Sequence, residues 1–125
     1  ADHVTARGFW RRSRVGEGAT AYYLPETLIR GEGVFRHTFF DDNLELRLVG
    51  RAVHRGEMAT AVPGEAEPVA LAAETTFRSE VLIRIDTFRI WWRTDNLTGV
   101  EQQDFEGLVF PASRNVFGIR WEFFD

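Results

Sequence analysis

The chain has 125 residues and a formal net charge of −4, so its length favours one domain, and no basic tract indicates a nucleic-acid-binding protein. It contains no cysteine, which excludes disulfides, thiol catalysis and thiolate metal sites. All 15 of its basic residues are arginine, a bias typical of a GC-rich genome. No apolar run approaches the roughly 18 residues that a membrane-spanning helix needs.

Apolar and polar residues alternate with a period of two over much of the chain, which predicts extended strands rather than helices. We therefore expect an all-β protein with a single domain over residues 1–125. Its architecture would be an antiparallel up-and-down meander of about six strands that forms part of a β-barrel. The predicted strands cover residues 4–14, 29–40, 44–55, 76–85, 88–97 and 114–124.

The predicted connections are alternately short and long. Asp41-Asp42-Asn43 and Asp86-Thr87 have the composition of tight turns. Long loops are predicted over residues 15–28, with a short apolar piece at 19–24, over residues 56–73 and over residues 98–113. In chain order, every short turn falls at one end of the sheet and every long loop at the other, as in outer-membrane barrels.

The two-residue turn at Asp86-Thr87 also predicts a register for the strands on either side of it. It pairs Ile85 with Phe88 and then aligns three charged pairs: Arg84 with Arg89, Glu80 with Arg93, and Arg78 with Asp95. The last two pairs have opposite signs and would stabilise the sheet. Arg84 and Arg89 would need a further acidic partner.

Each predicted strand has one apolar, strongly aromatic face and one charged face. The apolar candidates for contact with lipid or with a packed core are Phe77, Val81, Ile83, Ile85, Phe88, Ile90, Trp92, Phe117, Ile119, Trp121 and Phe123. The candidates for lining a polar lumen are Arg47, Arg51, Arg78, Glu80, Arg84, Arg89, Trp91, Arg93, Asp95, Arg120 and Glu122. Burying so many charges in a small soluble barrel is costly unless each is paired, which favours a water-filled lumen.

The arginines of the charged face have two interpretations. They could line a path for an anionic solute, or they could form a ladder of ion pairs with Glu45, Glu80, Asp95 and Glu122. The predicted cross-strand pairing favours the ladder.

The C-terminal part of the chain resembles a known family. The stretch Phe88–Thr98, with its Asp-Asn-Leu-Thr ending, is similar to the penultimate strand of TonB-dependent outer-membrane receptors, and Gly118–Phe123 is similar to their last strand. The resemblance covers residues 76–125. It implies a transport barrel of about 22 strands with a plug domain, to which this chain would contribute about six. Asp125 departs from the family, whose final residue is usually aromatic.

No constellation of residues indicates an enzyme. The three histidines, His3, His37 and His54, lack metal-ligand spacing, and Asp41-Asp42-Asn43 lacks the periodicity of a calcium loop. No phosphate-binding glycine loop or nucleophile elbow is visible. We therefore predict no catalytic residues, no metal and no cofactor.

Together these patterns predict a non-enzymatic outer-membrane β-barrel protein or fragment, similar to TonB-dependent receptors, from a Gram-negative, GC-rich bacterium. Its role would be transport or structural, and its partners the lipid bilayer and further barrel strands or other subunits. Two alternatives stay open. One is a soluble, lipocalin-like barrel that binds an apolar small molecule. The other is a structural subunit whose edge strands are completed by neighbours.

Overall fold

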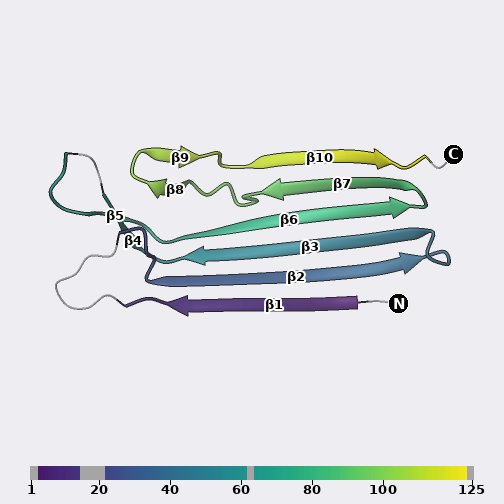
Figure 1. Cartoon of the computed structure of the whole chain (residues 1–125), viewed down its shortest axis with the longest axis horizontal. Helices are drawn as coiled ribbons and strands as arrows, with labels where there is room; N and C mark the ends of the chain where they lie inside the picture. Colours follow the sequence, from purple (N-terminus) through teal and green to yellow (C-terminus); the bar gives the residue numbers. More distant parts are fainter. Residues whose placement is uncertain (1–2, 15–21, 62–63, 124–125) are drawn as a thin grey trace.

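The computed structural model describes residues 3–14, 22–61 and 64–123. Six long strands form one antiparallel sheet in the order β1-β2-β3-β6-β7-β10, which confirms the expected all-β meander (Figure 1). Their bounds are β1 His3–Arg12, β2 Thr27–Phe39, β3 Leu44–Arg55, β6 Glu74–Ile85, β7 Phe88–Asp95 and β10 Arg114–Trp121. These bounds agree with the six predicted strands to within a few residues.

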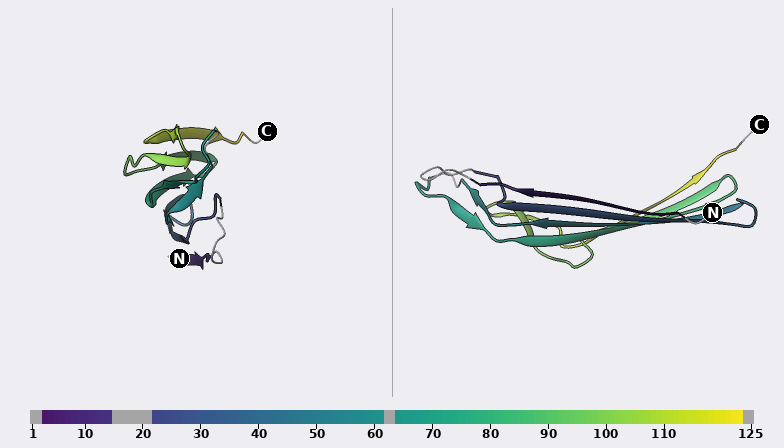
Figure 2. Two further views of the ribbon diagram at one scale, coloured as in Figure 1. Left: turned by 90° about the vertical axis from the view of Figure 1, so that its left-hand side faces the viewer. Right: turned by 90° about the horizontal axis from the view of Figure 1, so that it is seen from below.

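The long strands form a single twisted layer (Figure 2). β1 and β10 lie at opposite edges of this sheet, so the described strands form an open sheet and not a closed barrel. A single layer buries little side-chain surface. Among the described residues, the buried apolar core consists of Val49, Met58 and Leu71. In the described part of the chain, no helix is long and apolar enough to cross a membrane.

Both predicted tight turns are present at the same end of the sheet. The register across β6 and β7 pairs Ile85 with Phe88, Arg84 with Arg89, and Glu80 with Arg93, as predicted. Asp86 has a φ of 51°, and in the other turn Asp41 and Asp42 have φ values of 51° and 68°. Aspartate tolerates this left-handed region better than most residues, which explains the acidic turns.

The prediction of plain loops at the opposite end was wrong for two segments. Within residues 56–73, β4 (Met58–Thr60) pairs with β5 (Val69–Leu71). Within residues 98–113, β8 (Gln102–Phe105) pairs with β9 (Leu108–Phe110). Strands of three or four residues are too short for alternation to be recognised in the sequence. Their pairing is therefore established by the structure and not by the sequence pattern.

Smaller differences concern the ends of the predicted elements. Strand β7 ends at Asp95, two residues earlier than predicted, because Asn96 has a φ of 53° and leaves the extended conformation. The predicted first loop is shorter, because β2 already begins at Thr27. Residues 19–21 of the apolar piece at 19–24 and the end of the last predicted strand, Phe124, lie outside the described residues.

Candidate functional site

The register places all of the predicted apolar candidates on one face of the sheet, here called the apolar face. Row by row, Phe88 aligns with Ile85 and Trp121, and Ile90 aligns with Ile83 and Ile119. Phe123 follows β10 and stacks on Trp121, with their ring centroids 4.6 Å apart. The face is open: the exposed fractions are 57% for Trp92, 64% for Ile119 and 77% for Phe117.

The predicted charged candidates lie together on the opposite face, here called the charged face. By strand alternation, the apolar face of the six long strands carries no acidic residue among the described residues, and its single arginine is Arg12, at the end of β1. Nearly all the charges of the sheet therefore lie on one side. Such segregation is typical of a sheet whose two faces meet environments of different polarity.

Much of the charged face is an ion-pair ladder. Arg36 and Arg84 share Glu45 at 2.7 and 3.4 Å. Arg89 and Arg120 share Glu122 at 4.0 and 3.0 Å. Arg84 and Arg89 therefore have the acidic partners that the register requires. Two members of the ladder were not among the sequence candidates: Arg36, and Glu32, which pairs with Arg51 at 2.5 Å. Two glycines flank Glu32 and hide its place in an alternating strand.

Asp95 lies at the centre of a denser cluster. It forms ion pairs with Arg78 at 2.5 Å, with Arg114 at 3.0 Å and with Arg93 at 3.5 Å. Arg114 also donates a hydrogen bond to Asp95 Oδ2. The predicted pairing of Arg78 with Asp95 is thus confirmed. One carboxylate balances three guanidinium groups here, so the cluster keeps a positive surplus.

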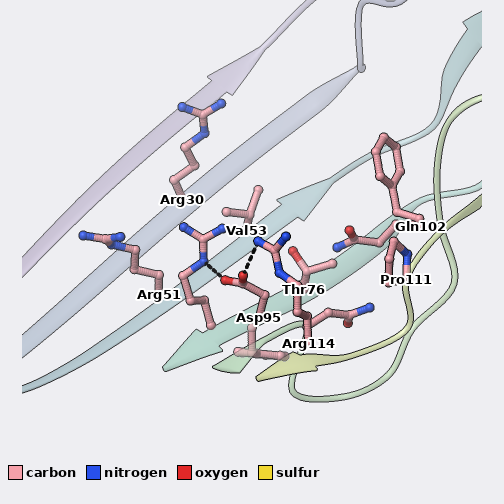
Figure 3. A pocket seen from close by; sticks show the side chains of 12 residues that line it. Arg30, Arg51, Val53, Thr76, Asp95, Gln102, Pro111 and Arg114 are labelled. Carbon is pink, nitrogen blue, oxygen red and sulfur yellow. Dashed lines mark hydrogen bonds and ion pairs between the residues drawn. The ribbon is translucent and has the colours of Figure 1, made fainter. Parts of the chain in front are cut away.

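The Asp95 cluster forms one side of a pocket of about 640 Å³ on the charged face (Figure 3). Arg30 and Arg51 line it from β2 and β3, and Arg114 lines it from β10. The β8–β9 segment completes the wall through Gln102, Phe110 and Pro111. The pocket therefore combines several guanidinium groups with an apolar wall. We take it as the candidate functional site.

Two buried polar side chains hold the β8–β9 segment in place. Arg55, which is 9% exposed, donates to the Gln103 carbonyl oxygen at 3.0 Å and pairs with Glu74 at 3.3 Å. The Asn96 side chain donates to the Val100 carbonyl oxygen at 2.6 Å and accepts from the Val100 N–H at 3.2 Å. Sequence reasoning missed Arg55, because an arginine at a strand end is usually solvated.

Trp91 also lies on the charged face and covers Gly118 on the neighbouring strand. These two residues are directly opposite each other in the β7–β10 register. A Cβ at position 118 would lie only 2.5 Å from the Trp91 indole nitrogen, Nε1. A glycine at this position therefore makes room for the ring, an arrangement known to stabilise glycines in sheets.

The described residues contain no group of three histidine, cysteine or acidic side chains that could hold a metal ion. His37 lies between Phe35 and Phe39, with ring centroids at 6.3 and 3.9 Å. His54 Nδ1 forms a hydrogen bond of 2.8 Å with Thr75 Oγ1. Both rings contact neighbouring side chains on the apolar face.

No protein-family model, curated protein or solved structure matches this chain. The case for a function therefore depends on the two faces and the pocket.

Proposed function

We propose that the chain is a membrane-embedded segment of an outer-membrane β-barrel, similar to TonB-dependent receptors, with its apolar face toward lipid. The charged face then faces the water-filled interior of the barrel. The role is non-enzymatic: passage of a solute, or support of the barrel that allows it. The segregation of the two faces of one uncovered sheet is the observation that carries this proposal.

The apolar face has dimensions that suit a bilayer. Phe39 lies ten positions after Ile29 along β2. At about 3.3 Å per residue and a tilt of about 40°, this distance corresponds to roughly 25 Å along the membrane normal, the height of the apolar band in such barrels. Phe39 and Trp121 lie near the short turns, while Trp10 pairs with Ile29 near the other end. Aromatic residues at both levels suit the two membrane interfaces.

The charged face suits water better than a packed core. Side chains such as Arg78 and Arg120 are 45% and 68% exposed even within their ion pairs. Burying them would remove hydration that a shared carboxylate does not replace. The lipocalin-like alternative needs the opposite arrangement, with the charged face in solvent and the aromatic face enclosed, yet Phe117 and Trp121 are exposed in the open sheet.

A structural subunit is the second candidate, and the two open edges of the sheet favour it. Among the described strands, β1 and β10 each pair on one side only, so each presents unpaired backbone groups along its other side. A closed membrane barrel usually needs at least about eight strands. The missing strands would come from the rest of a longer protein or from other subunits.

Reconstitution separates these functions. The protein, unfolded in urea, is diluted into lipid vesicles or into plain buffer, and the vesicles are floated on a density gradient. We expect the protein to float with the vesicles and to be released by detergent. It should resist release by roughly 1 M salt, which screens the attraction between surface charges. A soluble monomer with a cooperative thermal transition in plain buffer would contradict lipid contact. A defined oligomer in plain buffer would instead support the structural subunit.

A further inference from the structure

We propose that the pocket between the charged face and the β8–β9 segment binds a small organic anion, a carboxylate or phosphate attached to an apolar group. The inference deepens the proposed function, because it names the class of solute that the charged face takes. Its biological role rests on that function, whereas the binding itself depends only on the residues that line the pocket.

The charge balance of the pocket favours an anion. Five guanidinium groups meet at the pocket and its Asp95 cluster, from Arg30, Arg51, Arg78, Arg93 and Arg114. Within the described residues, only two carboxylates pair with these groups. Glu32 pairs with Arg51, and Asp95 pairs with Arg78, Arg93 and Arg114. The guanidinium groups therefore outnumber the carboxylates that form ion pairs with them by three. A concave site lined by charges of one sign concentrates counter-ions.

Arg30 is the group best placed to hold the ligand. It lines the pocket from β2, and its side chain forms no ion pair or hydrogen bond with any other residue in the described part of the chain. Its planar guanidinium has five N–H donors that match a carboxylate or phosphate in a forked geometry. Arg78 and Arg114 already share Asp95, so their remaining donors can complete the cradle.

The apolar wall makes the ligand organic rather than a simple inorganic ion. Val53 lines the pocket from the sheet, and Phe110 and Pro111 line it from the β8–β9 segment. The volume of about 640 Å³ is that of a small-molecule site rather than of a single ion. An aromatic or aliphatic group can lie against this wall while its anionic end reaches the arginines.

The test uses the protein in detergent micelles at low ionic strength, with phenyl phosphate, inorganic phosphate and phenol as probes in calorimetric titrations. We expect phenyl phosphate to bind most tightly, inorganic phosphate more weakly, and phenol not to bind. Arg30→Gln should weaken phenyl phosphate about tenfold, the usual scale for losing a charge-assisted hydrogen bond. Phe110→Ala should weaken phenyl phosphate and leave inorganic phosphate unchanged.

Arg47→Gln is the matched control. Arg47 lies on the same face of the adjacent strand and is exposed, and its side chain likewise forms no ion pair or hydrogen bond with a described residue, but it does not line the pocket. We expect it to leave phenyl phosphate affinity unchanged. Equal weakening by Arg30→Gln and Arg47→Gln would show diffuse attraction and overturn the site, as would wild-type protein that does not bind phenyl phosphate.

The two proposals fail separately. Protein that inserts into vesicles but does not bind phenyl phosphate in micelles overturns the pocket and leaves the membrane proposal standing. Protein that binds phenyl phosphate with the expected dependence on Arg30 but stays out of vesicles supports the pocket and overturns the membrane proposal.

Discussion

The indole ring of Trp91 lies against the backbone of Gly118 across the β7–β10 pair, where a Cβ atom would overlap it. The contact joins the last strand to the sheet on the charged face, where many other cross-strand contacts are ion pairs. It gives β10 an apolar contact that does not depend on lipid. The stability of the β10 edge of the sheet should therefore depend on the contact between Trp91 and Gly118.

Gly118→Ala should destabilise the protein by about 1–3 kcal/mol, because the added Cβ forces the Trp91 ring out of its position. Gly50→Ala is the matched control, since a Cβ there meets nothing within 4 Å. It should be neutral or stabilise the protein by up to about 1 kcal/mol, because alanine restricts the unfolded chain. Urea unfolding in detergent measures both. Equal losses in the two variants would contradict the Trp91 contact.

Glu45→Gln should lower the free energy of unfolding by about 1–3 kcal/mol, because Arg36 and Arg84 both lose their shared carboxylate. The value should fall toward the lower end, since the Arg36 side chain is 50% exposed. Glu80→Gln is the control: Glu80 lies on the same face, and its side chain forms no ion pair or hydrogen bond with a described residue. If both variants unfold at the same urea concentration, the shared pairing of Glu45 carries no stability.

Asn96→Gly should destabilise the protein by about 1–2 kcal/mol, because it removes two side-chain hydrogen bonds to Val100 while tolerating the positive φ. Asn96→Ala should cost about 1 kcal/mol more, since alanine is strained at that φ. Limited proteolysis of residues 98–113 should accelerate in both variants. Unchanged cleavage would show that Asn96 does not hold the β8–β9 segment.

The fold follows from the sequence where alternation is long and turns are short. Residues 76–97 show this most clearly: the alternation predicts the faces, and the Asp86-Thr87 turn predicts the register, which the structure confirms from Ile85–Phe88 to Glu80–Arg93. Opposite faces of one strand carry different residue types, so a single register decides where every side chain of the hairpin lies.

The pocket was not predictable in the same way. Arg51, Arg78 and Asp95 were candidates, but Arg30 and Phe110 were not, because they lie on segments without clear alternation. Their proximity depends on the folding of β8 and β9 over the sheet, held by Arg55 and Asn96. These contacts connect residues up to 48 positions apart in the sequence, which local periodicity does not encode.

Ile119→Glu should sharply reduce insertion into vesicles, because a carboxylate on the apolar face has to enter hydrocarbon. Val116→Glu is the matched control on the same strand: position 116 lies on the charged face, opposite Arg93. It should insert as well as the wild-type protein. Vesicle flotation measures the yield. Equal insertion of both variants would contradict a lipid-facing role for Ile119.

The most direct test of the two-faced sheet compares Trp91 with Trp92, neighbours in sequence on opposite faces of β7. Two variants, each keeping only one of these tryptophans and carrying phenylalanine at the other tryptophan positions, are reconstituted in vesicles whose acyl chains carry bromine. Bromine quenches only the fluorescence of nearby indoles. We predict strong quenching of Trp92 and little of Trp91. Equal quenching, or stronger quenching of Trp91, would contradict lipid contact on the apolar face.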